Sequence, residues 1–162
     1  MKSSLLLGAL TFAITSSLAS AGLVTKYNNV SSFTDFRYSE RSPASTQKAF
    51  DYQIKRQRSL TGWIGNNRTL EITFTDVDLA GRYEPFNFRG GSNPRVIRDL
   101  YPPRLKFNYV LKDASGRKIR SGSANISDNT FLLGARRNLG GRPFYYEFEL
   151  LRDWMRKTIP KA

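Results

Sequence analysis

The clearest strand signal in the chain lies at residues 70–79, which read LEITFTDVDL. The first three apolar residues of this segment alternate with polar ones, a period of two that is typical of a strand with one buried face. After Thr75 the pattern shifts by one residue, because the apolar positions are now Val77 and Leu79. We therefore predict a β-bulge or the end of the strand at Asp76.

A β-hairpin is predicted downstream of this strand. Apolar and polar residues alternate over residues 104–112, a turn containing glycine follows at 113–116, and residues 117–124 form the returning arm. Shorter strands are expected at 23–27 and 95–98. Residues 60–67 contain two Gly and two Asn, and this composition favours a turn.

Two helices complete the predicted fold. The first covers residues 43–58, where Ser42 and Pro43 form a typical helix start. The second covers residues 144–157, where apolar side chains recur at spacings of four, three and four. We predict one α+β domain over residues 22–162, with a mostly antiparallel sheet packed against these helices. A β-sandwich with peripheral helices is the alternative.

The N-terminus is predicted to be a signal peptide spanning residues 1–21. A charged start at Met1 and Lys2 is followed by an apolar region at 5–14 and by the small residues Ala-Ser-Ala at 19–21. A transmembrane anchor is the alternative, but polar residues interrupt the apolar run before it reaches the about 20 residues of a span. No later segment of the sequence approaches a membrane span. We therefore expect cleavage before Gly22 and a periplasmic or secreted protein.

Composition excludes several classes of function. The 162 residues include no His and no Cys, so Ser-His-Asp triads, Cys-His dyads, disulfides, zinc ribbons and iron–sulfur ligation are ruled out. Lys and Arg number 26 against 13 Asp and Glu, which gives a net charge of +13. Such a charge favours anionic partners. The absence of His, Cys and any known catalytic motif favours a non-enzymatic role.

Three carboxylates form the candidate cluster for chemistry: Asp76, Asp78 and Glu84. Two Asp residues two positions apart in a strand can point the same way and share a cation or a proton, and a site built from oxygen alone suits Ca²⁺. No other cofactor is expected. The structural alternative is that Asp76 and Asp78 bind backbone N–H groups at the bulge, or pair with Arg82.

Arginine residues form the candidate anion-binding set. Arg outnumbers Lys by 17 to 9, and the planar guanidinium suits bidentate contact with phosphate and carboxylate. Aromatic residues lie among these basic groups, yet no nucleic-acid-binding motif occurs and nucleic acid is an unlikely partner for an exported protein. A basic surface with no dedicated partner is the alternative. The candidates are Arg95, Arg98, Arg104, Arg136, Arg137 and Arg142.

Several segments, in this order, resemble the bacterial exported family catalogued as domain of unknown function 3016. They are FTD at 33–35, TFTDVDLAG at 73–81, RYEP at 82–85, RVIRDLYPPR at 95–104, YE at 146–147 and LLRDW at 150–154. The resemblance covers nearly all of residues 22–162. It implies a small exported bacterial protein, and it brings no activity, ligand or catalytic residue with it.

Three functions are therefore compared. The first is an exported, non-enzymatic module that binds an anionic envelope polymer or lipid headgroups through arginine with aromatic support. The second is a hydrolase or lyase that uses the carboxylate cluster, which requires these groups to converge in a pocket. The third is a protein–protein module that adds a strand to a partner or docks through the apolar stripe of residues 144–157. Docking through that stripe requires it to be exposed.

Overall fold

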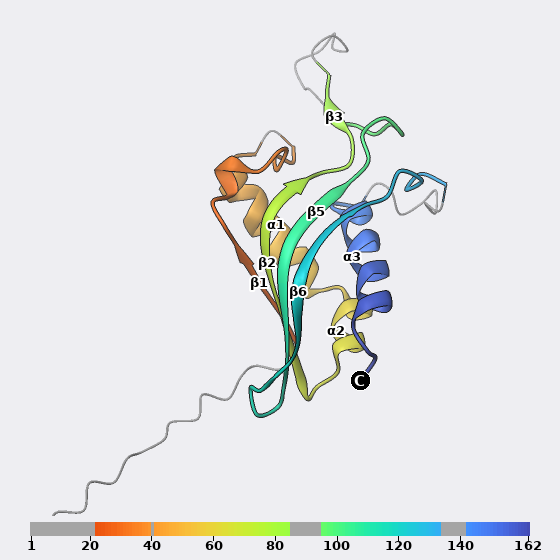
Figure 1. Ribbon diagram of the computed structural model, residues 1–162. Coiled ribbons are helices and arrows are strands. Elements are labelled where there is room, and N and C mark those ends of the chain that lie inside the picture. The colour runs from red at the N-terminus through yellow and green to blue at the C-terminus, as the bar shows by residue number, and fades with distance from the viewer. Residues whose placement is uncertain (1–21, 40, 85–94, 134–141) are drawn as a thin grey trace, which may run out of the picture.

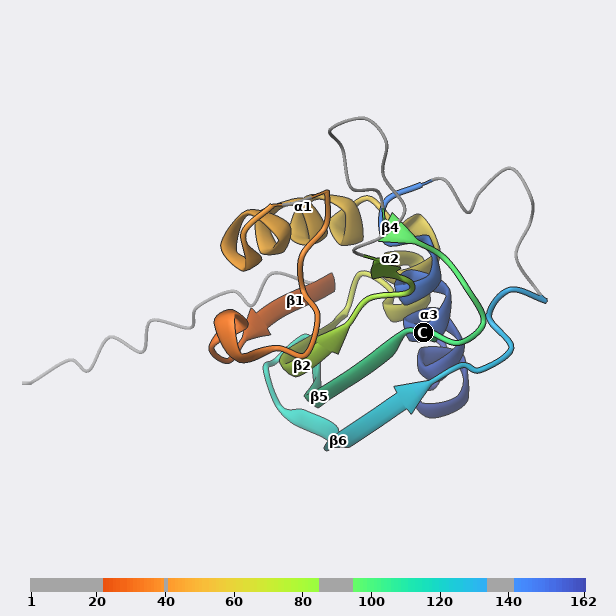
Figure 2. The same ribbon diagram turned by 90° about the horizontal axis from the view of Figure 1, so that it is seen from above.

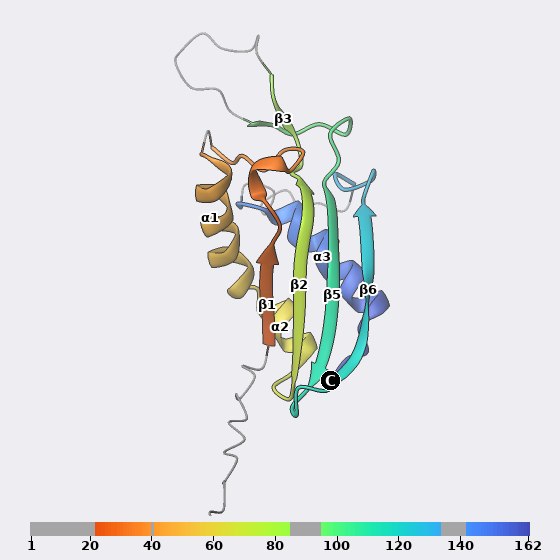
Figure 3. The ribbon, with the colours of Figure 1, turned by 60° about the vertical axis from the view of Figure 1, so that its left-hand side comes forward.

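The computed structural model describes residues 22–39, 41–84, 95–133 and 142–162. Their centre is a four-stranded sheet in the order β1 (Gly22–Tyr27), β2 (Arg68–Asp78), β5 (Arg104–Asp113) and β6 (Lys118–Ser127). Strand β1 runs parallel to β2, and the other neighbours are antiparallel, as the views along and across the sheet show (Figures 1 and 3). The predicted α+β class, with a mostly antiparallel sheet, is confirmed.

The helices lie on one face of this sheet. Helices α1 (Pro43–Lys55) and α2 (Arg58–Ile64) belong to the connection between β1 and β2, and α3 (Tyr145–Thr158) lies beside them on the same face (Figure 2). A 3-10 helix, η1 (Val30–Ser32), follows β1. The parallel β1–β2 pair needs such a crossover, because a tight turn joins only antiparallel neighbours.

The alternation in β2 is confirmed, together with the predicted bulge. Pairing with β5 is regular up to Phe74, which faces Phe107, and it shifts between Phe74 and Asp76, so that Thr75 is the extra residue. The shift keeps Val77 on the buried face while Asp76 faces Lys106 on the open face. The insertion therefore lets one strand bury both halves of its apolar pattern.

The β5–β6 hairpin and the helices complete the hydrophobic core. Trp154 of α3 packs edge-on against Phe107 and Tyr109 of β5, with ring centroids 4.7 and 5.0 Å apart. The apolar stripe of α3 is buried throughout, so this stripe is core and offers no docking face. Its members are Phe148, Leu151 and Met155, with Phe144 immediately before the helix.

The prediction of a turn at residues 60–67 was wrong. Residues 60–67 do not form only a turn, because α2 extends through Ile64. Leu60 and Ile64 lie one helical turn apart and both are buried, and this burial outweighs the low helix propensity of Gly62. Gly65 then ends the helix at a φ of 78°.

A second, smaller sheet extends from one end of the first. It pairs β3 (Arg82–Tyr83) with β4 (Arg95–Val96) in antiparallel register, at the top of the view in Figure 1. The start of β4 agrees with the short strand expected at 95–98. Since β3 directly follows β2 and β4 precedes β5, this end of the sheet brings the predicted carboxylates close to three of the predicted arginines.

Candidate functional site

Asp76 is bound by the fold. Its Oδ1 accepts the backbone N–H of Thr34 at 2.8 Å, its Oδ2 accepts the Thr34 hydroxyl at 3.0 Å, and Lys106 Nζ lies 3.2 Å from Oδ2. Burial alone would raise the pKa of Asp76, but these hydrogen bonds and the Lys106 charge outweigh it and hold the pKa below its usual value. Asp76 thus fastens the segment after η1 to the bulge, as the structural alternative predicts.

Asp78 differs from Asp76. It lies opposite Arg104 in the β2–β5 register, and no side chain in the described part of the structure makes a hydrogen bond or an ion pair with its carboxylate. Burial, followed by the nearby charges of Asp35 and Asp76, raises its pKa, while Arg82 and Arg95 oppose that shift. The Asp78 side chain lines a cavity of about 320 Å³, which we call the Asp78 cavity.

Glu84 lies apart from the Asp78 cavity. Its Oε2 forms an ion pair with Arg98 Nη2 at 3.0 Å, and neither residue lines the cavity. Asp76 does not line the cavity either. The structure therefore brings the three candidate carboxylates to one end of the sheet, but of these three only Asp78 lines the Asp78 cavity.

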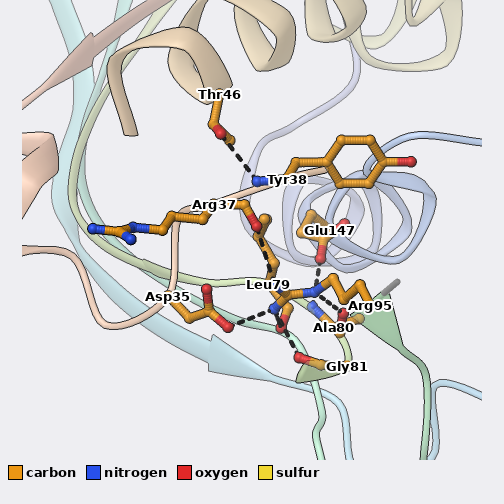
Figure 4. A network of polar contacts seen from close by, with 9 residues as sticks. All are labelled: Asp35, Arg37, Tyr38, Thr46, Leu79, Ala80, Gly81, Arg95 and Glu147. Carbon is orange, nitrogen blue, oxygen red and sulfur yellow. Dashed lines mark hydrogen bonds and ion pairs between the residues drawn. The ribbon is translucent and has the colours of Figure 1, made fainter. Parts of the chain in front are cut away.

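Arg95 lies inside the fold, with a side chain that is only 7% exposed. Its Nη2 donates to the carbonyls of Leu79 and Gly81, both at 2.7 Å, and to Asp35 Oδ2 at 2.8 Å (Figure 4). Its Nε donates to the carbonyl of Ala80 at 2.7 Å, and its Nη1 to the carbonyl of Arg37. Because each of its nitrogens donates to the fold and the side chain is nearly buried, Arg95 stabilises the loop after β2 and is poorly placed to bind an external anion.

Glu147 completes this network, although in the sequence it was singled out only as part of the YE segment at 146–147. The side chain is 3% exposed, and its Oε1 accepts the backbone N–H of Ala80 at 2.7 Å (Figure 4). Burial raises the pKa of Glu147, against the backbone hydrogen bonds from Ala80 and from Glu147 itself and the charge of Arg95. Arg95 therefore binds the backbone carbonyls of residues 79–81, and Glu147 binds the backbone N–H in the middle of the same segment.

The remaining arginine candidates lie in different places. Arg104 lines the Asp78 cavity. Arg142 is exposed, three residues before the start of α3, and contributes to a groove beside α1. Arg136 and Arg137 lie outside the described residues, so their part in binding stays a prediction.

A strongly basic hollow lies beside α1. It consists of two adjoining cavities of about 390 and 380 Å³ that share Gln53 and Pro143, and we call it the α1 groove. Its basic residues are Arg41, Lys48, Arg56, Arg142 and Arg152. Its one carboxylate, Glu149, is already in a two-point contact with Arg152.

The other cations of the α1 groove are not neutralised. Within the described ranges, no carboxylate forms an ion pair with Arg41, Lys48, Arg56 or Arg142. Tyr52 adds an aromatic surface that is 60% exposed, and the Arg56 guanidinium lies 5.1 Å from its ring centroid and donates to its hydroxyl. The groove thus combines unpaired positive charge with an exposed aromatic ring, a combination with which proteins bind extended polyanions.

No group of three or more Asp and Glu side chains in the described part of the chain is arranged to hold a metal ion. No helix within it is long and apolar enough to cross a bilayer.

Comparison with known proteins identifies the family. The family model described as "Protein of unknown function (DUF3016)" matches residues 22–157, which is most of the chain. No curated protein and no solved structure matches. The match begins at the first residue of β1 and ends within the last turn of α3, so it covers every strand and all but the last residue of α3. The chain therefore belongs to the DUF3016 family.

Proposed function

We propose that this protein is an exported, non-enzymatic module that binds an anionic polymer of the cell envelope along the α1 groove. The observation that carries the proposal is the concentration of unpaired cations there. By contrast, three lysines of the described sheet have carboxylate partners: Lys26 and Lys112 pair with Glu71, and Lys106 pairs with Asp76. Keeping several like charges together without partners costs stability, and a bound polyanion relieves that cost.

The shape of the α1 groove favours a polymer over a flat membrane surface. The hollow extends over two cavities that adjoin at Gln53 and Pro143, and cations line both of them. An extended chain with a negative charge on each repeat contacts such cations in succession. A lipid headgroup layer, in contrast, meets a convex or flat basic surface best.

A carboxylate-based enzyme has less support from the geometry. General acid–base catalysis by paired carboxylates needs two such groups at one reacting centre. Asp76 is bound by Thr34 and Lys106, and Glu84 is paired with Arg98, while Asp78 alone lines its cavity. For these reasons binding, and not hydrolysis, is the function we propose.

The proposal is tested by titrating the purified protein with fluorescent dextran sulfate, with neutral dextran and anionic lipid vesicles as comparisons. We expect binding to dextran sulfate alone. The double variant R56Q/R142Q should weaken that binding roughly tenfold, because two contacts in the groove are lost. The control R117Q/K118Q removes the same charge at the β5–β6 turn and should leave affinity nearly unchanged. Equal losses in the two variants would show that net charge, and not the groove, drives binding.

Export is the second part of the proposal and has its own test. Residues 1–21 have the charged start, apolar region and small-residue end of a signal peptide. When the full chain is expressed in a bacterium, the protein recovered from the periplasm or medium should begin at Gly22 on N-terminal sequencing. Protein retained in the cytoplasm with residues 1–21 still attached would overturn this part.

A further inference from the structure

The Asp78 cavity shares no lining residue with the α1 groove and has a different charge pattern. It lies where β2 ends and β5 begins. One carboxylate and two guanidinium groups line it, from Asp78, Arg82 and Arg104, together with the ring of Tyr101. A hollow with both signs of charge is not suited to a simple polyanion.

Asp78 offers an unused acceptor to this cavity. It is half-buried in β2, and among the described side chains none makes a hydrogen bond or an ion pair with it. The two nearby carboxylates are both occupied: Asp35 binds Arg95, and Asp76 binds Thr34 and Lys106. A half-buried carboxylate without a donor is costly, and a cationic donor entering the cavity offsets that cost.

Arg82 and Arg104 offer donors to the same cavity. Both residues are exposed, and no carboxylate of the described ranges lies within ion-pair distance of either guanidinium. The Arg82 guanidinium lies over the Tyr101 ring at 5.5 Å from its centroid, which orients it without using its N–H groups. Guanidinium groups that have no carboxylate partner are well suited to bind the phosphate or carboxylate of a ligand.

We propose that the Asp78 cavity binds a small zwitterion, whose phosphate or carboxylate contacts Arg82 and Arg104 and whose primary ammonium contacts Asp78. The volume of about 320 Å³ lies at the lower end of small-molecule sites, so the ligand is the size of an amino acid or a phospholipid headgroup. A phosphate together with a primary ammonium occurs both in small free compounds and in the headgroups of ethanolamine lipids. The experiment below distinguishes these two sources of the ligand.

Isothermal titration of the purified protein with phosphoethanolamine, inorganic phosphate and ethylammonium tests this proposal. Phosphoethanolamine should bind about tenfold or more tightly than either of the other two, because only it makes both charge-assisted contacts. Vesicles containing phosphatidylethanolamine, compared with phosphatidylcholine vesicles, test the lipid source. Binding to those vesicles without binding to the free compound assigns a lipid, and the reverse assigns a free ligand.

Variants then assign the contacts. D78N should abolish the preference for phosphoethanolamine over phosphate, and R104Q should weaken the binding of both. The control D153N removes an exposed carboxylate on α3 and should change neither. Equal binding of phosphoethanolamine and phosphate by the unmodified protein, or binding of neither free compound nor vesicle, would overturn the proposal without any variant. The α1 groove variant R56Q/R142Q should bind phosphoethanolamine normally, so the two sites are tested separately.

Discussion

Glu147, the third residue of α3, accepts a hydrogen bond at Oε1 from the backbone N–H of Ala80, 2.7 Å away at the end of β2. This contact joins the C-terminal helix to the DLAG segment at residues 78–81. Arg95 holds the same segment from its carbonyl side. The segment that contributes Asp78 and Leu79 to the Asp78 cavity is therefore held by the side chains of Glu147 and Arg95, and both of these side chains are largely buried.

The first prediction concerns the pH dependence that Glu147 gives to stability. Burial raises its pKa, so the folded protein binds this proton more tightly than the unfolded chain does. The free energy of unfolding should therefore fall as pH rises from about 4, near the ordinary Glu value, through the raised pKa. E147Q keeps an oxygen that can accept from Ala80 and removes this contribution. Urea unfolding at several pH values should show the variant gaining on the unmodified protein as pH rises; a constant difference between them would contradict this.

The second prediction concerns Arg95. Replacing it in R95Q removes the donors for the carbonyls of the 79–81 segment and leaves Asp35 without its ion pair. Loss of one partner from such a buried pair should cost about 3–5 kcal/mol of unfolding free energy. The matched variant R98Q breaks the ion pair of a side chain that is 53% exposed and should cost less than about 1 kcal/mol. Denaturant unfolding of both variants makes the comparison, and similar losses would mean that Arg95 is not the centre of the network.

The third prediction uses two glycines with nearly the same backbone conformation. Gly81 and Gly116 have φ values of 78° and 79°, but a Cβ at Gly81 would lie 2.4 Å from the carbonyl oxygen of Val96, while a Cβ at Gly116 meets nothing within 4 Å. G116A should therefore cost only the left-handed conformation, about 1–2 kcal/mol. G81A should cost clearly more, because the backbone of β4 at Val96 must also shift. Thermal unfolding of the two variants measures the difference, and equal losses would argue against close packing at Gly81.

The sequence predicted the parts of this fold that depend on periodic burial. The alternation in β2, the bulge at Asp76 and the stripe of α3 all arise from apolar residues that must face one core, and such patterns are visible along the chain. Helix α2 was missed because Gly62 and the flanking Asn residues resemble a turn, and only the tertiary burial of Leu60 and Ile64 makes the segment helical.

The site was less predictable, because its contacts join residues far apart in sequence. Arg95 was expected to bind an external anion, yet it binds Asp35, 60 positions away. Glu147 was not among the candidate carboxylates, yet it accepts from the backbone of Ala80, 67 positions away. The sequence shows that these residues are charged. Which of the charges are buried is determined by how β4 and α3 pack against the end of β2. The cations of the α1 groove come from similarly distant segments.

The most direct test of the account is the salt dependence of dextran sulfate binding. The logarithm of the binding constant should fall linearly with the logarithm of salt concentration, and R56Q/R142Q should reduce the slope by about two, one unit for each lost contact. The control R117Q/K118Q should keep the slope of the unmodified protein, although its side chains at the β5–β6 turn are also exposed. A slope that is the same in all three proteins would contradict the assignment of the α1 groove as the binding site.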